Sequence, residues 1–262
     1  MSTTPYDIGT PGTPWGASER AAWRARQDKK RDFEDDVGAP IRALAERFAV
    51  VQYGVLGPEG GSLPLLGLRT RDWQPDRPVA LITGGVHGYE TSGVHGALRF
   101  AQAHAAAHEG RWNLVLAPCV SPWGYETVNR WNPAAEDPNR SFRPDSPAPE
   151  ARQLQACIAV QGLPPRLHLD LHETTDTDHT EFRPALAARD GKALVSSPIP
   201  DGFYTVGPTA RPPSPSRRPS SNRSPGSPTS RSPTRAGGSS ASRCPAAASP
   251  STTPGPSGCA WG

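Results

Sequence analysis

A histidine and a glutamate that could share a metal ion follow an apolar segment of the chain. The segment at residues 81–90 reads LITGGVHGYE, so the apolar run stops at Gly84-Gly85 and is followed by His87 and Glu90. A glycine pair lets the backbone turn sharply, which allows an imidazole nitrogen and a carboxylate oxygen to point at one ion. Zinc accepts this mixture of ligands readily. The pair therefore predicts half of a zinc site.

The third ligand is expected at the end of a second strand, far downstream. A catalytic zinc takes three protein ligands and keeps one position open for water. The segment at 167–173, LHLDLHE, places His172 at the end of an apolar strand, and we predict it as the third ligand. His168 and Asp170 lie on the same strand face as His172. We expect His168 to be a structural histidine and Asp170 a buried hydrogen-bond acceptor that could also position a ligand.

Other residues offer alternatives to this assignment. His95 lies on the helix that follows the first pair, five residues after Glu90, and this spacing argues against a fourth ligand. His179 with Glu181 could form a competing site or supply the third ligand instead. Since an HxxE spacing is frequent by chance, His87 and Glu90 could also be solvated residues of a polar loop.

The elements that must position these residues predict an α/β domain. A strand, a helix and a strand in succession imply a parallel pair of strands. Ligands gather at strand ends in such sheets, and His87 and His172 both follow predicted strands. We expect a mixed, largely parallel central sheet flanked by helices. The expected helices are 17–48 (with a break near 38–40), 91–108 and 148–160, and the expected strands are 48–56, 62–68, 78–83, 112–117 and 166–172, of which the first two form a hairpin.

Composition and charge limit the remaining functions. The chain has 262 residues, which suits one large domain or two small ones, and its formal charge of +3 is too small by itself to imply a nucleic-acid partner. The 4 cysteines show no CxxC spacing, and the first residues lack the pattern of a secretory signal, so a cytoplasmic location is expected. No apolar run approaches the roughly 20 residues that a bilayer requires, so no membrane partner is expected.

The sequence divides into three parts of different character. Residues 1–16 form a Pro- and Gly-rich leader that we expect to be flexible, and residues 17–206 have the composition of a folded domain. Residues 207–262 contain no acidic residue and no Leu, Ile or Val, so we predict a disordered tail. The tail could be a basic arm, at 222–235, for RNA or a phosphorylated partner, or a flexible linker. Translation out of frame is the third interpretation, and the abrupt change of composition favours it.

Four motifs together resemble a known family. They are HGYE at 87–90, PWGYE at 122–126, DPNRSF at 137–142 and LDLHE at 169–173. In this order they resemble the M14-type zinc metallocarboxypeptidases, including the succinylglutamate desuccinylase and aspartoacylase branch. The resemblance implies a zinc carboxypeptidase-like α/β fold over residues 17–206, incomplete at its C-terminal side and therefore with an exposed strand edge.

The resemblance also assigns roles to individual residues. His87, Glu90 and His172 would bind one Zn²⁺ ion, and Asp137 would orient the first of these ligands from behind. This metal set is the same one that the spacing of the residues predicts.

Substrate recognition is implied for three further residues. Asn139 and Arg140 would bind a substrate carboxylate, and Arg130 is the candidate for stabilising the oxyanion. The implied activity is hydrolysis of an amide bond next to a free carboxylate. The substrate would be a peptide or, in a deacylase of the same fold, a small N-acyl amino acid.

The general base of the family, a Glu on a late strand, has no counterpart, because no carboxylate follows Asp201. Glu173 is expected to point to the opposite strand face, and the sequence does not fix the position of Glu181. We therefore expect a truncated hydrolase that is impaired or inactive. The rival interpretation is a non-catalytic zinc-binding protein whose basic tail contacts nucleic acid or an acidic partner.

Overall fold

The structure is a computed structural model that describes residues 6–162, 164–175, 177–195 and 205. The helices and strands of this part of the chain belong to one compact unit that contains residues 1–201. Residues 202–256 form a second unit, of which only Thr205 is described. The predicted tail at 207–262 lies outside the described residues. In the described part of the chain, no helix is both long enough and apolar enough to cross a bilayer.

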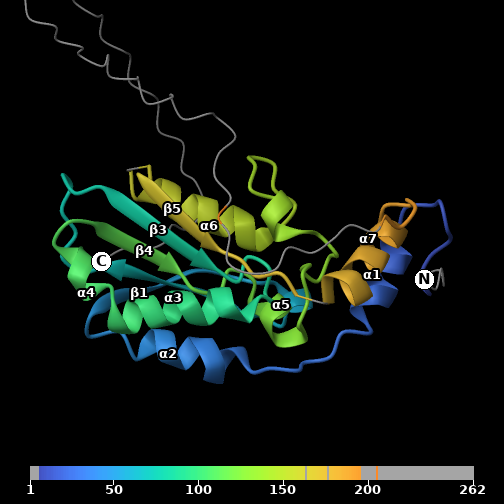
Figure 1. The fold of residues 1–262 in the computed structure, drawn as a ribbon, viewed down its shortest axis with the longest axis horizontal. Helices are drawn as coiled ribbons and strands as arrows, with labels where there is room; N and C mark the ends of the chain where they lie inside the picture. The colour runs from blue at the N-terminus through green and yellow to red at the C-terminus, as the bar shows by residue number, and fades with distance from the viewer. Residues whose placement is uncertain (1–5, 163, 176, 196–204, 206–262) are drawn as a thin grey trace, which may run out of the picture. The chain divides into compact units, whose positions relative to one another are not determined.

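A five-stranded mixed sheet forms the centre of the domain (Figure 1). Its strands are β1 (Phe48–Val55), β2 (Pro64–Thr70), β3 (Val79–Gly84), β4 (Asn113–Ala117) and β5 (Leu167–Leu171), in the spatial order β1-β2-β4-β3-β5. β1 and β2 form the expected antiparallel hairpin, β2 is antiparallel to β4, and β3 is parallel to both β4 and β5. β1, β3, β4 and β5 therefore run in one direction, which confirms the predicted mixed, largely parallel sheet.

Helices cover both faces of this sheet (Figure 1). α2 (Ala39–Arg42) and α3 (Thr91–Ala103) pack on one face, where Ile82 of β3 and Val94 of α3 share a buried cluster. α6 (Pro149–Val160) packs on the other face, where its Leu154 joins Leu65 of β2. Every residue of β3 and β4 is buried, as expected for parallel strands that are covered on both sides. The two apolar runs are therefore central strands.

Two predicted helices differ from the observed ones. The expected helix over 17–48 consists of α1 (Ala17–Arg24) and, after an irregular segment, a π-helix, η1 (Glu34–Gly38), that continues into α2. The chain does not break near 38–40: Pro40 lies where the π-helix η1 changes into α2, in the first turn of α2. The expected helix over 91–108 is α3 followed by a separate short helix, α4 (Ala106–Glu109).

The remaining helical segments are short and connect the larger elements. They are η2 (Pro58–Gly60), α5 (Pro122–Thr127), η3 (Pro138–Arg140), η4 (Asp178–Phe182) and α7 (Arg183–Arg189).

The N-terminal leader is packed where it is described, in contrast to the flexible leader that we expected over 1–16. Ile8 and Trp15 are 5% and 6% exposed. The backbone N–H of Trp15 donates to the carbonyl of Arg189 in α7 at 2.9 Å, and its ring packs edge-on against Trp131. Proline and glycine suggested a flexible segment, but burial of aromatic surface stabilises it on the domain.

β5 lies at one edge of the sheet, where it pairs with β3. Leu167 and Leu169 of this strand are exposed, at 40% and 47%. Within the described residues, β5 is therefore an edge strand with exposed apolar side chains.

Candidate metal centre

The loop between β3 and α3 carries the first two candidate ligands. It turns at Gly85, whose φ of +55° favours glycine. At Gly88 a Cβ atom would lie 2.0 Å from the backbone nitrogen of Tyr125, so a larger residue cannot be placed without moving the backbone. The loop buries His87 and brings Glu90 to the N-cap position of α3. The glycines of this segment therefore fix where the two side chains lie.

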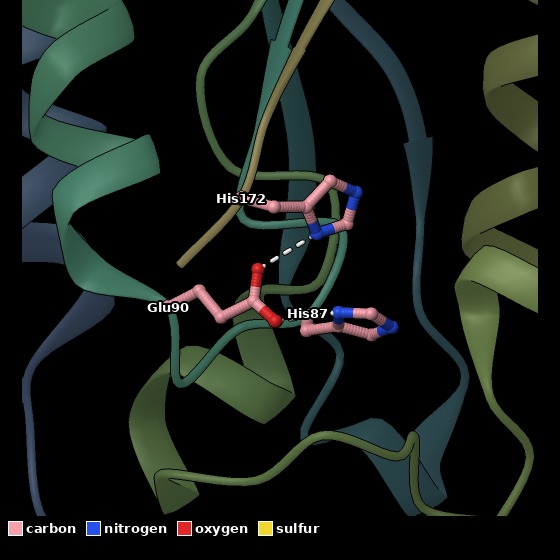
Figure 2. Close-up of side chains that lie close together, drawn as sticks. All are labelled: His87, Glu90 and His172. Carbon is pink, nitrogen blue, oxygen red and sulfur yellow. Dashed lines mark hydrogen bonds and ion pairs between the residues drawn. The ribbon is translucent and has the colours of Figure 1, made fainter. Parts of the chain in front are cut away.

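The structure brings the three predicted metal ligands together (Figure 2). Nδ1 of His87 lies 2.7 Å from Oε1 of Glu90, and Nδ1 of His172 lies 2.7 Å from Oε2 of the same carboxylate. The three candidate ligand atoms lie within 4.8 Å of one another. His87 and Glu90 are buried, whereas His172, which follows β5 directly, is exposed. The cluster can therefore be reached from solvent on the His172 side.

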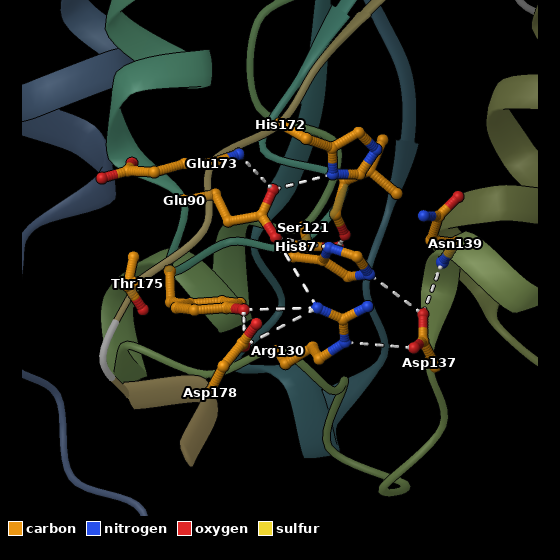
Figure 3. Close-up of polar contacts among 12 residues, drawn as sticks. His87, Glu90, Ser121, Arg130, Asp137, Asn139, His172, Glu173, Thr175 and Asp178 are labelled. Atoms are coloured by element: carbon orange, nitrogen blue, oxygen red, sulfur yellow. Dashed lines mark hydrogen bonds and ion pairs between the residues drawn. The ribbon is translucent and has the colours of Figure 1, made fainter. Parts of the chain in front are cut away.

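A carboxylate also lies against the outer nitrogen of each histidine, and Figure 3 shows the one beside His87. Oδ1 of Asp137 lies 3.1 Å from Nε2 of His87, and Oδ2 of Asp170 lies 2.8 Å from Nε2 of His172. The hydroxyl of Thr83 donates to Asp170 at 2.7 Å and fixes that carboxylate. A carboxylate on Nε2 selects the tautomer that leaves Nδ1 free for a metal and makes it a better ligand. This donor set fits zinc.

The cluster holds a proton when no metal is bound. Burial alone would raise the pKa of Glu90, but His172 and His87 outweigh this effect and lower the pKa to about 2. Burial would lower the pKa of His172, but Asp170 and Glu90 raise it to about 10. A metal ion that binds here therefore replaces a proton on the imidazole of His172.

The motif at 137–140 forms a capped turn beside the cluster. The carboxylate of Asp137 accepts hydrogen bonds from the backbone N–H groups of Asn139, at 2.9 Å, and Arg140, at 3.3 Å, at the start of η3. The same oxygen lies against His87, so the capped turn fixes the carboxylate that supports the ligand. Asn139 is half-buried and Arg140 is exposed. Arg140 is therefore accessible to solvent.

Arg130 lies beside the ligands and is partly buried. Its Nε donates to Oδ2 of Asp137 at 3.3 Å, and its Nη1 donates to the hydroxyl of Tyr89 at 3.2 Å. Nη1 also lies 3.7 Å from Oε1 of Glu90. Burial lowers the pKa of Arg130, but the charge of Asp137 and the contact with Tyr89 outweigh it, so the pKa is raised. The side chain is a permanent cation next to the candidate metal site.

The other carboxylates considered from the sequence have different surroundings. Oε2 of Glu173 accepts a hydrogen bond at 2.9 Å from the backbone N–H of Ser92, at the start of α3, and its side chain points away from the cluster (Figure 3). Glu181 is exposed in η4 and lines a cavity together with Tyr89 and Arg130. The carboxylate of Glu173 is therefore turned away from the cluster.

The alternative histidines do not join the cluster, which consists of His87, Glu90 and His172. Nε2 of His168 lies 2.8 Å from the hydroxyl of Thr83, which agrees with a structural role. His95 faces the hydroxyl of Tyr125 at 3.5 Å. His179 is exposed in η4. His172 is thus the third member of the group.

Two contacts of the site were not identified from the sequence. One is the support of Asp170 by Thr83, which the parallel pairing of these two residues across β3 and β5 could have suggested. The other is the hydrogen bond at 2.5 Å from the hydroxyl of Tyr89 to Asp178. No spacing rule connects these last two residues, because they are 89 positions apart and meet only in the folded chain.

Fold and site together define an α/β domain with a candidate metal centre at the ends of parallel strands. Residues 76–195 match the family model of the succinylglutamate desuccinylase/aspartoacylase catalytic domain. This match confirms the family resemblance that the motifs predicted. No curated protein matches the chain.

Several solved structures are similar to part of the chain. A proposed metallopeptidase of Shewanella denitrificans is 27% identical, with 54% of each chain covered and a TM-score of 0.45. A metallo-carboxypeptidase of Burkholderia cenocepacia is 20% identical, with 62% of this chain and 42% of that chain covered and a TM-score of 0.43. A metallo-carboxypeptidase of Pseudomonas aeruginosa, in complex with (2-guanidinoethylmercapto)succinic acid, is 20% identical, with 68% and 53% covered and a TM-score of 0.42. The chain thus spans about half the length of the first of these structures.

Proposed function

We propose that this chain holds one zinc ion on His87, Glu90 and His172 and is the metal-binding part of an amide hydrolase. The observation that carries the proposal is the pair of outer carboxylates. Asp137 and Asp170 each hold the Nε2 of one histidine, so that both Nδ1 atoms turn toward Glu90. Two histidines oriented in this way are typical of a built metal site rather than of a solvated polar loop.

The substrate of the proposed hydrolase carries a free carboxylate next to the scissile amide. A bound zinc ion would polarise the scissile carbonyl and acidify a water molecule. The exposed guanidinium of Arg140 and the amide of Asn139 would bind the carboxylate, since a guanidinium recognises carboxylates in a bidentate manner. Arg130 would stabilise negative charge on the carbonyl oxygen during hydrolysis.

We further propose that the chain by itself hydrolyses such substrates slowly or not at all. Amide hydrolysis needs a base that accepts a proton from water and passes it to the leaving amine. Asp137 and Asp170 are engaged with the ligands, and Glu173 caps α3 instead. Asp178, a buried carboxylate beside Arg130, accepts the hydroxyl proton of Tyr89 and is engaged as well.

Zinc content and hydrolysis test the proposal together. The full chain is saturated with zinc and dialysed, and zinc is measured by mass spectrometry in the wild type, in His87→Ala and in His95→Ala. We expect one zinc ion per wild-type chain, its loss in His87→Ala and its retention in His95→Ala, because His95 lies outside the cluster. The same samples are assayed with an N-acyl amino acid and with a peptide that has a free C-terminus.

Each outcome tests a different part of the proposal. A wild-type protein without zinc, or a His87→Ala variant that keeps it, contradicts the metal site. Zinc-dependent turnover on the order of 1 per second or faster, as in ordinary enzymes, contradicts the impaired activity and shows by substrate preference whether the enzyme is a carboxypeptidase or a deacylase. Salt-dependent RNA binding that is lost on deleting residues 207–262 would support the rival binding protein.

A further inference from the structure

A tyrosine and an aspartate contact one side of Arg130. They are neither candidate metal ligands nor part of the motif at 137–140. The hydroxyl of Tyr89 accepts a hydrogen bond from Nη1 of Arg130 at 3.2 Å and donates its own proton to Oδ1 of Asp178 at 2.5 Å. Asp178 is also 3.9 Å from Nη1 by the same oxygen. The three side chains form one continuous set of contacts, of which Figure 3 labels Arg130 and Asp178.

The tyrosine and the aspartate of this set are buried, and they come from two distant parts of the chain. Tyr89 is 5% exposed and Asp178 is 9% exposed. Phe182, which lies in η4 together with Asp178, adds a ring face 4.4 Å below the guanidinium carbon. Hydrogen bonds to charged groups are strong in such surroundings, because water competes poorly for them. The loop of Tyr89 and the helix η4 are therefore tied together through Arg130.

The guanidinium is held at two of its three nitrogens. Asp137 accepts from Nε on one side, and Tyr89 accepts from Nη1 on the other. One anchor leaves a planar group free to rotate, whereas two anchors fix its plane. Neither of these two hydrogen bonds uses Nη2. The cation is thus oriented beside Glu90 while part of its hydrogen-bonding capacity is kept for another partner.

We infer that Tyr89 and Asp178 are positioning residues that orient Arg130 to bind a negatively charged oxygen beside the metal. This inference rests on the proposed function, which supplies the metal and the amide substrate whose carbonyl oxygen becomes negative. Asp178 acts through Tyr89, and Tyr89 acts through Arg130. A fixed donor stabilises developing charge better than a mobile one, because no reorientation is needed during the reaction.

Binding of phenylphosphonate to the zinc-loaded full chain tests this inference without requiring turnover. The phosphonate oxygens imitate the charged oxygen of the substrate. Calorimetry would compare the wild type with Tyr89→Phe and Asp178→Asn. We expect each substitution to weaken binding roughly tenfold, as the loss of a hydrogen bond to a charged group does, while one zinc ion is retained. Thermal unfolding of each variant checks that it folds.

A second tyrosine–aspartate pair provides a matched control. The hydroxyl of Tyr125 donates to Asp36 at 3.1 Å, which is the same type of hydrogen bond without a contact to Arg130. Tyr125→Phe is expected to keep the wild-type affinity for phenylphosphonate within twofold. In an Arg130→Gln background, Tyr89→Phe is expected to cause no further loss, because its effect passes through the arginine.

The outcomes distinguish this inference from the proposed function. A wild-type chain that binds no zinc contradicts the proposed function itself. A zinc-loaded wild type with unchanged phosphonate affinity in Tyr89→Phe and Asp178→Asn contradicts the inference and leaves the metal site intact. Absence of phosphonate binding by the zinc-loaded wild type, or an equal loss from Tyr89→Phe with and without Arg130, also overturns the inference.

Discussion

Oδ1 of Asp137 lies 3.1 Å from Nε2 of His87, although the two residues are 50 positions apart. This contact leaves Nδ1 of the same ring to face Glu90 at 2.7 Å. Burial would raise the pKa of Asp137, but His87 and Arg130 outweigh it and hold the pKa well below its ordinary value, so the carboxylate stays charged. The pair therefore sets both the tautomer and the orientation of the first candidate ligand.

Replacing the outer carboxylate should weaken metal binding without removing a ligand. Asp137→Asn keeps an oxygen that can cap η3 but loses the charge that supports His87. We expect the affinity for zinc to fall about 10–100-fold, as is usual for such supporting groups. Competition with a coloured chelator measures this affinity. Asp145→Asn, an exposed carboxylate paired with Arg143, should leave it unchanged, and equal affinities in all three proteins would contradict the role of Asp137.

Two glycines of α3 should respond oppositely to the same substitution. A Cβ at Gly93 would lie 2.3 Å from the carbonyl oxygen of Leu171, so Gly93→Ala must move the end of β5 and with it His172. We expect a loss of about 1–3 kcal/mol in the free energy of unfolding, together with weaker zinc binding. At Gly96 the nearest atom is 3.6 Å away, in the flexible side chain of Leu171. Gly96→Ala should be neutral or stabilise by up to about 1 kcal/mol, because alanine favours helix.

Denaturant unfolding of the two variants, with zinc removed and with zinc added, measures both effects. The pair controls for helix propensity, since both positions lie in α3. A Gly93→Ala protein as stable as Gly96→Ala would show that β5 is not packed against this helix as described.

The elements predicted best from the sequence are the strands whose residues are all buried. The runs at 78–83 and 112–117 are apolar throughout, and they are the central strands β3 and β4. The leader was harder to predict, because Trp15 is buried by Trp131, which is remote in sequence. The unbroken passage from η1 into α2 was missed because Pro40 suggests a break unless it falls in a first helical turn.

In the candidate site too, the residues that a local sequence pattern marks were predicted, and the others were not. His87 and Glu90 form a local motif, and His172 ends a recognisable strand, so the sequence predicts all three and the structure brings them together. Tyr89 and Asp178 carry no such pattern. Their contact depends on where the segment after β5 returns to the loop after β3, and that path is a tertiary property of the chain.

Arg140 should determine whether a free carboxylate matters to binding. We expect zinc-loaded wild type to bind an N-acetyl amino acid more tightly than the corresponding amide. The exposed guanidinium can donate two hydrogen bonds to a charged carboxylate but cannot pair in this way with a neutral amide. Arg140→Gln should reduce this preference roughly tenfold, and Arg143→Gln, a nearby exposed arginine, should keep it. Calorimetric titration with both ligands checks this expectation. If Arg140→Gln kept the preference for the free carboxylate, the carboxylate would bind at a residue other than Arg140.

Glu150 should make the metal-free protein less stable as the pH rises. This residue is 1% exposed in the first turn of α6, where Oε2 accepts one long hydrogen bond, of 3.4 Å, from Asn132 and Oε1 has no partner among the described residues. Burial raises its pKa from 4.5 to about 7 despite the opposing effects of its own backbone N–H and of Asn132. The folded state thus binds the proton more tightly than the unfolded state does. The contribution of Glu150 is complete below pH 4.5 and is lost as the pH rises to about 7, with a total of about 3 kcal/mol.

Glu150→Gln should remove this loss, because the amide is neutral at every pH. In urea unfolding with a metal chelator present, the variant and the wild type should have similar stability near pH 4.5. Above pH 7 the variant should be more stable by an amount that approaches about 3 kcal/mol. Glu59→Gln, which alters an exposed carboxylate, should follow the wild-type curve. Parallel curves for Glu150→Gln and wild type across this range would mean that the buried carboxylate is already stabilised when charged, through a polar partner that the described contacts do not include.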